Sequence, residues 1–133
     1  MAKMIHSMIR VKDADRSIKF YHDVFALVVK RRIDFNDFSL IYLGNDETSF
    51  ELELTWNRDT TVDYTIGNGY GHLAFATDSL QAIYNKAQKN SYYPKEIKNF
   101  YNQNQNVLIA RFFFIKDPDG YDIEVIEKSD VYR

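Results

Sequence analysis

The chain has 133 residues, no cysteine and a formal net charge of −2 at pH 7. The lack of cysteine excludes disulfides, a thiolate nucleophile and thiolate metal ligands, so any metal ion has to be bound by His, Asp or Glu. The charge gives no general attraction to nucleic acid or to an anionic membrane, and no apolar stretch approaches the roughly 20 residues of a membrane span.

The first half of the chain has the order strand, helix, strand, strand, strand. Residues 4–11 alternate between polar and apolar, which predicts a strand with His6 and Ile9 on opposite faces. Asp13 is the candidate N-cap of the helix that follows. The N-terminus lacks the apolar core of a signal peptide, so a cytoplasmic protein is expected. The further strands of this half are predicted at residues 28–33, 38–43 and 50–56.

The same order begins again after a polar connection at residues 57–69. Asp78 is the candidate N-cap of the second helix. The Asn- and Gln-rich residues 99–106 are interpreted as a long loop. Pro94 interrupts the strand-like run after the helix, which predicts an edge strand there. The strands of this half are predicted at residues 71–76, 92–97, 107–115 and 121–127.

The repetition predicts one domain of α+β class, residues 1–133, made of two βαβββ modules related by a pseudo-twofold axis. The modules cover about residues 4–57 and 70–128. Their last strands are similar, with Phe-Glu-Leu-Glu-Leu in the first module and Tyr-Asp-Ile-Glu-Val in the second. The turn Asp-Pro-Asp-Gly at 117–120 fixes the register of the last strand, and register decides which face each side chain occupies.

Each module contributes one histidine and one glutamate at equivalent places. His6 and His72 lie in the first strands, and Glu53 and Glu124 take the fourth place of the similar last strands. Two imidazoles and two carboxylates suit a divalent ion such as Zn, Ni, Co, Mn or Fe. Each residue alone has an ordinary alternative, a half-buried histidine or a glutamate on the solvent face of a strand. The spacing by itself leaves this alternative open.

Three further polar residues are candidates for binding a substrate. Period-two alternation puts Arg10 on the face of His6 and Asn57 on the face of Glu53. Arg binds a carboxylate with its two-pronged guanidinium and Asn binds a peptide amide, whereas the alternative for Arg10 is an ion pair with a surface acid. Arg111 interrupts an apolar run, where it could contact a ligand, a partner chain or water.

As a set, four segments resemble the lactoylglutathione lyases (glyoxalase I) of the vicinal oxygen chelate superfamily. The resemblance covers nearly the whole chain. It implies paired βαβββ modules, one divalent metal ion per site, and a homodimer in which His6 and Glu53 of one chain meet His72 and Glu124 of the other. The segments that carry it are residues 6–11 with 17–21, 53–57, 70–74 and 117–124.

The resemblance also implies the chemistry. The two histidines and two glutamates would be the metal ligands, with Ni or Co favoured over Zn, while Arg10 and Asn57 would hold glutathione. Glu124 would be the catalytic base and Glu53 the second catalytic carboxylate. The substrate would be the hemithioacetal of methylglyoxal and glutathione, isomerised to S-lactoylglutathione through an enediolate, which serves methylglyoxal detoxification. A divalent cation can stabilise the negative oxygens of an enediolate, and a carboxylate can move the proton.

Two positions depart from the pattern of that family. A Lys-Gly-Gly-like loop is replaced by residues 106–108, Asn-Val-Leu, and a basic residue four places before the second metal histidine is replaced by Asn68. Two expected contacts to glutathione carboxylates are therefore missing, which leaves the thiol open. The alternatives are an epimerase or a dioxygenase-like enzyme on the same scaffold, and a metal-free protein that sequesters a small molecule such as an antibiotic. The second glutamate argues against the dioxygenase.

Overall fold

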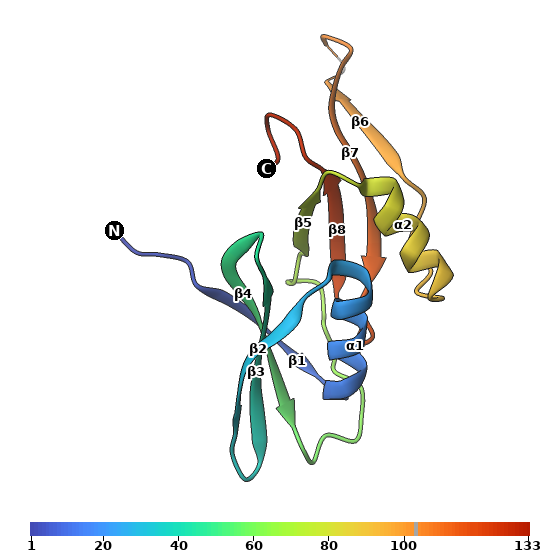
Figure 1. Cartoon of the computed structure of the whole chain (residues 1–133). Helices are drawn as coiled ribbons and strands as arrows, with labels where there is room; N and C mark the ends of the chain where they lie inside the picture. The colour runs from blue at the N-terminus through green and yellow to red at the C-terminus, as the bar shows by residue number, and fades with distance from the viewer. Residues whose placement is uncertain (103) are drawn as a thin grey trace. The chain divides into compact units, whose positions relative to one another are not determined.

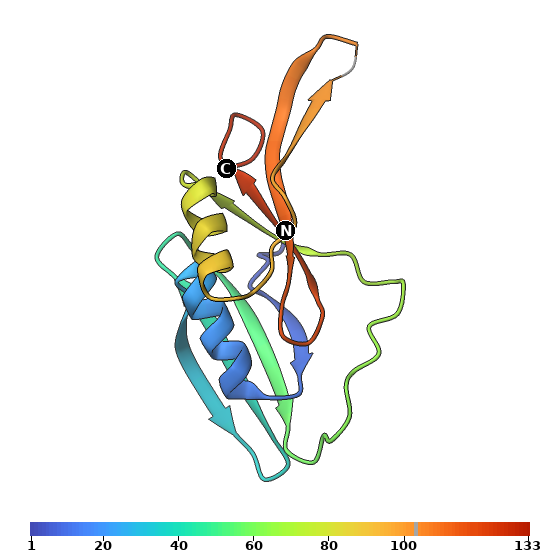
Figure 2. The same ribbon diagram turned by 90° about the vertical axis from the view of Figure 1, so that its right-hand side faces the viewer.

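The computed structural model describes residues 1–102 and 104–133. It divides into two compact units, Met1–Thr65 (unit 1) and Ile66–Arg133 (unit 2), whose elements are labelled in Figure 1 and seen from another side in Figure 2. Both units have the order strand, helix, strand, strand, strand. The α+β class and the two βαβββ modules are thus confirmed, and the boundary lies in the predicted polar connection. Within the described ranges, no helix is both long and apolar enough to cross a membrane.

Unit 1 is a four-stranded sheet with one helix. The strand order is β1-β4-β3-β2, with β1 parallel to β4 and the other neighbours antiparallel. The helix begins as predicted, because the Asp13 carboxylate accepts a hydrogen bond of 3.0 Å from the Arg16 amide. The elements are β1 (His6–Val11), α1 (Ala14–Phe25), β2 (Val28–Asp34), β3 (Phe38–Asn45) and β4 (Thr48–Asn57).

Unit 2 repeats this topology. Its strand order is β5-β8-β7-β6, with β5 parallel to β8 and the other neighbours antiparallel. The first and last strands of the unit are thus adjacent in both sheets, as a βαβββ repeat requires. The elements are β5 (Leu73–Thr77), α2 (Leu80–Lys89), β6 (Lys98–Asn102), β7 (Val107–Lys116) and β8 (Asp122–Glu127).

The strand predicted at residues 92–97 is wrong. The edge strand is β6, which begins at Lys98 and covers residues 99–102 of the segment interpreted as a long loop. Residue 103 of that segment lies outside the described residues. Ser91 and Tyr93 have φ of 60° and 53°, which interrupts extended backbone, and Pro94 has no amide to donate. Strand pairing with β7 therefore begins only at Lys98, and its register shifts between Phe100 and Tyr101.

The predicted N-cap of the second helix is also wrong by one residue. Ser79 occupies the cap position and its side chain makes no capping hydrogen bond. The carboxylate of Asp78 instead lies 3.4 Å from the Lys128 ammonium, on the segment that follows β8. The helix boundary therefore rests on its apolar residues, chiefly the buried Leu80 and Ala87.

The last strand of each unit alternates between a buried apolar face and a face that carries the glutamate. In β4, Leu52 and Leu54 are buried in the core on either side of Glu53. In β8, Ile123 and Val125 are buried and fully enclosed on either side of Glu124. Because side chains alternate across a strand, both glutamates lie on the sheet face opposite the aliphatic core.

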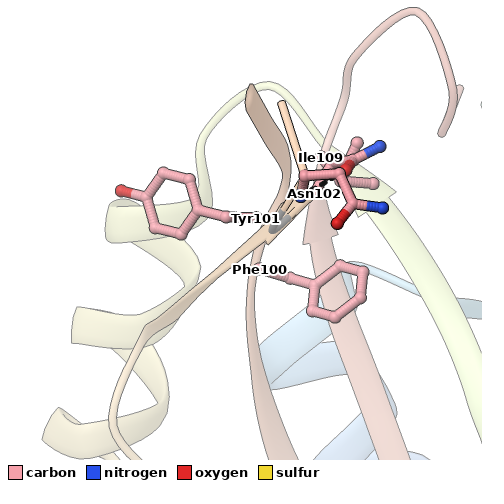
Figure 3. A pocket seen from close by; sticks show the side chains of 5 residues that line it. Phe100, Tyr101, Asn102 and Ile109 are labelled. Carbon is pink, nitrogen blue, oxygen red and sulfur yellow. Dashed lines mark hydrogen bonds between the residues drawn. The ribbon is translucent and has the colours of Figure 1, made fainter. Parts of the chain in front are cut away.

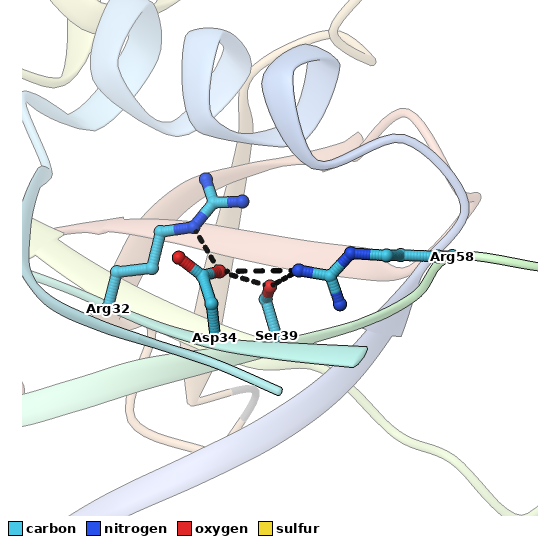
Figure 4. Close-up of polar contacts among 4 residues, drawn as sticks. All are labelled: Arg32, Asp34, Ser39 and Arg58. Atoms are coloured by element: carbon cyan, nitrogen blue, oxygen red, sulfur yellow. Dashed lines mark hydrogen bonds and ion pairs between the residues drawn. The ribbon is translucent and has the colours of Figure 1, made fainter. Parts of the chain in front are cut away.

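A polar cluster lies in unit 1 where β2 ends and β3 begins (Figure 4). Ser39 is fully buried, accepts a hydrogen bond of 2.7 Å from Arg58 and donates one to the Asp34 carboxylate. The Ser39 hydroxyl, followed by the Arg32 guanidinium, holds the pKa of Asp34 below its usual value. Ser39 and Tyr42 lie three residues apart on β3 and therefore on opposite faces of the sheet. Because Tyr42 is on the face of Glu53, the cluster is on the other face and has a structural role.

Candidate metal centre

In unit 1, the structure brings His6 and Glu53 together. The Nε2 atom of His6 lies 3.2 Å from Oε1 of Glu53. The other carboxylate oxygen, Oε2, accepts a hydrogen bond of 2.8 Å from the hydroxyl of Tyr42. The Glu53 side chain is only 10% exposed, whereas the His6 side chain is 34% exposed. The pair is therefore anchored on its carboxylate side and open to solvent on its imidazole side.

Tyr42 is part of this site, and the sequence did not indicate it. Tyr42 lies directly opposite Glu53 in the β3–β4 pairing. Its ring meets the His6 ring edge to face, with centroids 5.8 Å apart, and the Arg31 guanidinium lies 4.1 Å from its centroid on the sheet surface. The hydrogen bond to the Glu53 carboxylate, together with burial, raises the pKa of Tyr42, so the phenol stays protonated and donates.

In unit 2, the structure brings His72 and Glu124 together in the same way. The Nε2 atom of His72 lies 3.7 Å from Oε1 of Glu124. Phe114 lies directly opposite Glu124 in the β7–β8 pairing, and its ring meets the His72 ring edge to face at 5.3 Å. The two half-sites thus share one arrangement, a histidine and a glutamate with an aromatic ring across the strand pair.

The Asp-Pro-Asp-Gly turn sets the register that places Glu124. The buried Asp117 carboxylate accepts hydrogen bonds from the amides of Asp119 at 2.9 Å and Tyr121 at 3.0 Å. Gly120 has φ of 94°, a left-handed conformation that suits glycine. The chain then enters β8 with Lys116 paired to Asp122 and Phe114 paired to Glu124.

Replacing Asp117 with Ala is expected to destabilise the protein by about 2 to 3 kcal/mol, because two turn amides lose their acceptor. Urea unfolding followed by circular dichroism measures this change. The exposed Asp130→Ala is the matched control and should unfold like the wild type. An unchanged unfolding midpoint for Asp117→Ala would contradict the role given to this turn.

The candidate substrate-binding residues lie in different surroundings. Arg10 is exposed on β1, two alternations beyond His6 on the same strand face. The Asn57 side chain, at the end of β4, donates a hydrogen bond of 3.2 Å to the Tyr64 hydroxyl. Arg111 forms an ion pair of 2.9 Å with Glu127 on the neighbouring strand. The structure thus assigns Arg111 a cross-strand partner.

A shallow hollow on the β6–β7 hairpin has a different character (Figure 3). Its lining consists of aromatic, aliphatic and amide side chains and contains no histidine, aspartate or glutamate. It therefore offers no ligands to a metal ion and is distinct from the two half-sites. The residues that line it are Phe100, Tyr101, Asn102, Asn104 and Ile109.

The donor atoms of the two half-sites fit a divalent metal ion. Nitrogen and oxygen ligands about 2.1 Å from one ion lie about 3.0 to 3.5 Å from each other in octahedral or tetrahedral arrangement. The separation of 3.2 Å in unit 1 matches this range and the 3.7 Å in unit 2 is slightly wider. Among residues 1–102 and 104–133, no three or more His, Asp or Glu side chains gather in a group that could hold an ion. The structure therefore shows two separate histidine–glutamate pairs.

Comparison with known proteins identifies the family. A sequence profile of the Glyoxalase/Bleomycin resistance protein/Dioxygenase superfamily matches residues 3–125. The chain belongs to this superfamily. It is 36% identical to a lactoylglutathione lyase of Neisseria meningitidis, over 96% of this chain and 91% of that protein. It is 33% identical to the lactoylglutathione lyase of Haemophilus influenzae, over 96% of this chain and 93% of that protein.

Solved structures of glyoxalase I share the fold of this superfamily member. A trypanothione-dependent glyoxalase I of Leishmania major superimposes with a TM-score of 0.74 at 32% identity, over 96% of this chain and 87% of that chain. Glyoxalase I of Zea mays superimposes with a TM-score of 0.81 at 30% identity, over 96% of this chain and 45% of that chain. The expected resemblance to glyoxalase I is thus confirmed.

Proposed function

We propose that this protein is a metal-dependent lactoylglutathione lyase (glyoxalase I). The observation that carries the proposal is the pair of equivalent half-sites, each with a histidine nitrogen close to a glutamate oxygen. Relatives that are lactoylglutathione lyases and match nearly the full chain support the same activity. The reaction is the isomerisation of the hemithioacetal of methylglyoxal and glutathione to S-lactoylglutathione.

The residues that would hold the metal ion are His6, Glu53, His72 and Glu124. This set of neutral nitrogens and anionic oxygens accepts Ni, Co or Zn, and we favour Ni or Co. When bound, one divalent ion supplies a positive charge that stabilises the negative oxygens developing on the substrate. The two glutamates balance the charge of the ion.

Glu124 is the proposed base of the reaction. Its carboxylate takes the proton from the thiol-bearing carbon of the hemithioacetal and returns it to the adjacent carbon, so that no net acid or base is consumed. Its side chain is 20% exposed, which leaves it access to a substrate, and Phe114 lies opposite it across the strand pair. Glu53 is the second catalytic carboxylate and is more deeply buried.

The glutathione part of the substrate needs its own binding groups. Arg10 is exposed on the strand of His6, which suits it to pair with a carboxylate of the tripeptide. The Asn57 amide, whose nitrogen contacts Tyr64, is suited to the peptide bonds. The replaced Lys-Gly-Gly-like loop and Asn68 remove two cationic or amide contacts, so we expect a raised KM for glutathione adducts. A cytoplasmic location stays a prediction from the sequence.

We further propose that the active form is a homodimer whose sites combine two chains. His6 and Glu53 of one subunit would join His72 and Glu124 of its partner, giving two sites per dimer related by a twofold axis. Each unit holding one half of the ligand set supports this arrangement.

Reconstitution of the apoprotein tests the proposed function. The protein is loaded with Ni, Co or Zn, mixed with methylglyoxal and glutathione, and followed by the thioester absorbance. We expect turnover that depends on the metal and disappears with a chelator. Turnover with trypanothione instead of glutathione would correct the thiol but keep the reaction. Stoichiometric metal binding without turnover on any hemithioacetal would overturn the enzyme, and absence of metal binding would favour a metal-free binding protein.

A further inference from the structure

We propose that Tyr42 is a positioning residue that gives the two glutamates of the centre different roles. Its hydroxyl holds Glu53 in place as a fixed metal ligand, and the phenylalanine at the equivalent place in unit 2 leaves Glu124 able to move as the base. The part of this inference that concerns Glu124 as the base rests on the proposed function. The part that concerns Glu53 as a ligand rests on metal binding alone.

Tyr42 and Phe114 occupy the same place in the two units. Each lies on a central strand of its sheet, directly opposite the glutamate of the neighbouring strand. Each ring meets the histidine of its own half-site edge to face, at 5.8 Å for Tyr42 and 5.3 Å for Phe114. Cross-strand partners point to the same sheet face, so each ring lies beside the glutamate of its own unit. The chemical difference between the two rings is a single hydroxyl.

The hydroxyl changes how each carboxylate is held. In unit 1, Oε1 of Glu53 lies beside His6 and Oε2 accepts the hydrogen bond from Tyr42, so both oxygens have a partner. In unit 2, His72 is the only group in the described ranges that makes an ion pair or hydrogen bond with the Glu124 carboxylate. Glu124 therefore has a carboxylate oxygen to which none of residues 1–102 and 104–133 donates a hydrogen bond.

Tyr42 is itself held firmly enough to act as an anchor. It is 8% exposed, its ring is covered by the Arg31 guanidinium at 4.1 Å, and Arg31 is fixed in turn by an ion pair of 2.9 Å with Glu51. A hydrogen bond from a fixed donor orients a ligating carboxylate and strengthens metal binding. A base that carries a proton between two carbons has to change position, which such a bond would hinder.

Tyr42→Phe tests the anchor. This variant makes unit 1 resemble unit 2 and is expected to weaken metal binding about tenfold, measured on the apoprotein by competition with a chromogenic chelator. A changed absorption spectrum of the Co-loaded protein should accompany it. Tyr84→Phe is the matched control, because the Tyr84 hydroxyl accepts from Gln88 on the exposed face of α2. A metal affinity of Tyr42→Phe within twofold of wild type, with the fold retained, would overturn the anchor.

Phe114→Tyr tests the other half of the inference. The added hydroxyl is expected to hold Glu124 and to lower kcat about tenfold, while metal affinity is kept or rises and KM changes little. An unchanged kcat in a folded Phe114→Tyr variant would overturn the assignment of mobility to Glu124. Metal affinity is measured without substrate. Wild-type protein that binds metal but shows no turnover would therefore overturn the proposed function and the role of Glu124 as the base. The role of Tyr42 would still be tested by the metal affinity of Tyr42→Phe. Wild type that binds no metal would overturn both.

Discussion

Glu124→Gln is expected to lower kcat by about 10² to 10⁴-fold, because a positioned general base contributes about that much. The amide has the shape of the carboxylate and keeps one oxygen near His72, but it cannot accept the substrate proton. Metal binding should weaken far less than turnover, since three of the four proposed ligands are unchanged. Steady-state kinetics at saturating metal, with metal content measured on the same sample, gives both quantities.

The matched control is Glu127→Gln on the same strand. Glu127 pairs with Arg111 on the surface, three residues beyond Glu124 and therefore on the other face of β8. Its ion pair is partly exposed and worth at most about 1 kcal/mol, so this variant should fold and turn over like the wild type. Wild-type kcat in metal-loaded Glu124→Gln would rule out Glu124 as the base.

The sequence was most informative where the two halves repeat. The equivalent positions of the two histidines and two glutamates predicted one centre of four residues. Within each unit the structure brings the histidine and the glutamate together, because a strand's alternation decides the face of each side chain. Phe114 was not predicted, although the register set by the turn before β8 would have reached it. The turn after Lys116 pairs Lys116 with Asp122, and extending that register by two residues reaches Glu124.

Tyr42 was not predicted, because a β-bulge separates it from the turn. At the turn, Asn45 pairs with Thr48, and extending that register would place Tyr42 opposite Glu51. The register shifts between Leu43 and Asn45, so Tyr42 faces Glu53 instead. A bulge depends on local backbone geometry that periodicity does not reveal. Its effect here is to give one of the two carboxylates a phenol donor.

Composition also misled the interpretation of residues 92–106, because it does not reveal local backbone geometry either. Tyr92 and Ile97 suggested a strand by propensity, but left-handed backbone at Tyr93 precludes it. The strand forms instead at Lys98–Asn102, which is polar at both ends and pairs with β7 through its backbone. Residue propensity is a weak indicator of an edge strand, because pairing with the neighbouring strand supplies most of its stabilisation.

Mixing two inactive variants is expected to restore activity if the sites combine two chains. A dimer of His6→Ala with Glu124→Ala would have one site with both defects and one site built only from unchanged halves. Random exchange at equal amounts makes about half the dimers mixed, so about one quarter of wild-type activity should return. The two variants are mixed after dissociation in mild denaturant, refolded with metal and assayed against each variant treated alone.

The control mixture combines His6→Ala with Glu53→Ala. Both changes lie in unit 1, so each site of a mixed dimer that shares sites between chains still has one altered first half and should stay inactive. Recovery in the first mixture and none in the second is therefore specific to sites between chains. If the sites instead lie within one chain, every site in both mixtures carries a defect, and the absence of recovery in the first mixture would overturn the shared centre. The ligand roles of the four residues would then be retained while the dimer lost its part in the chemistry.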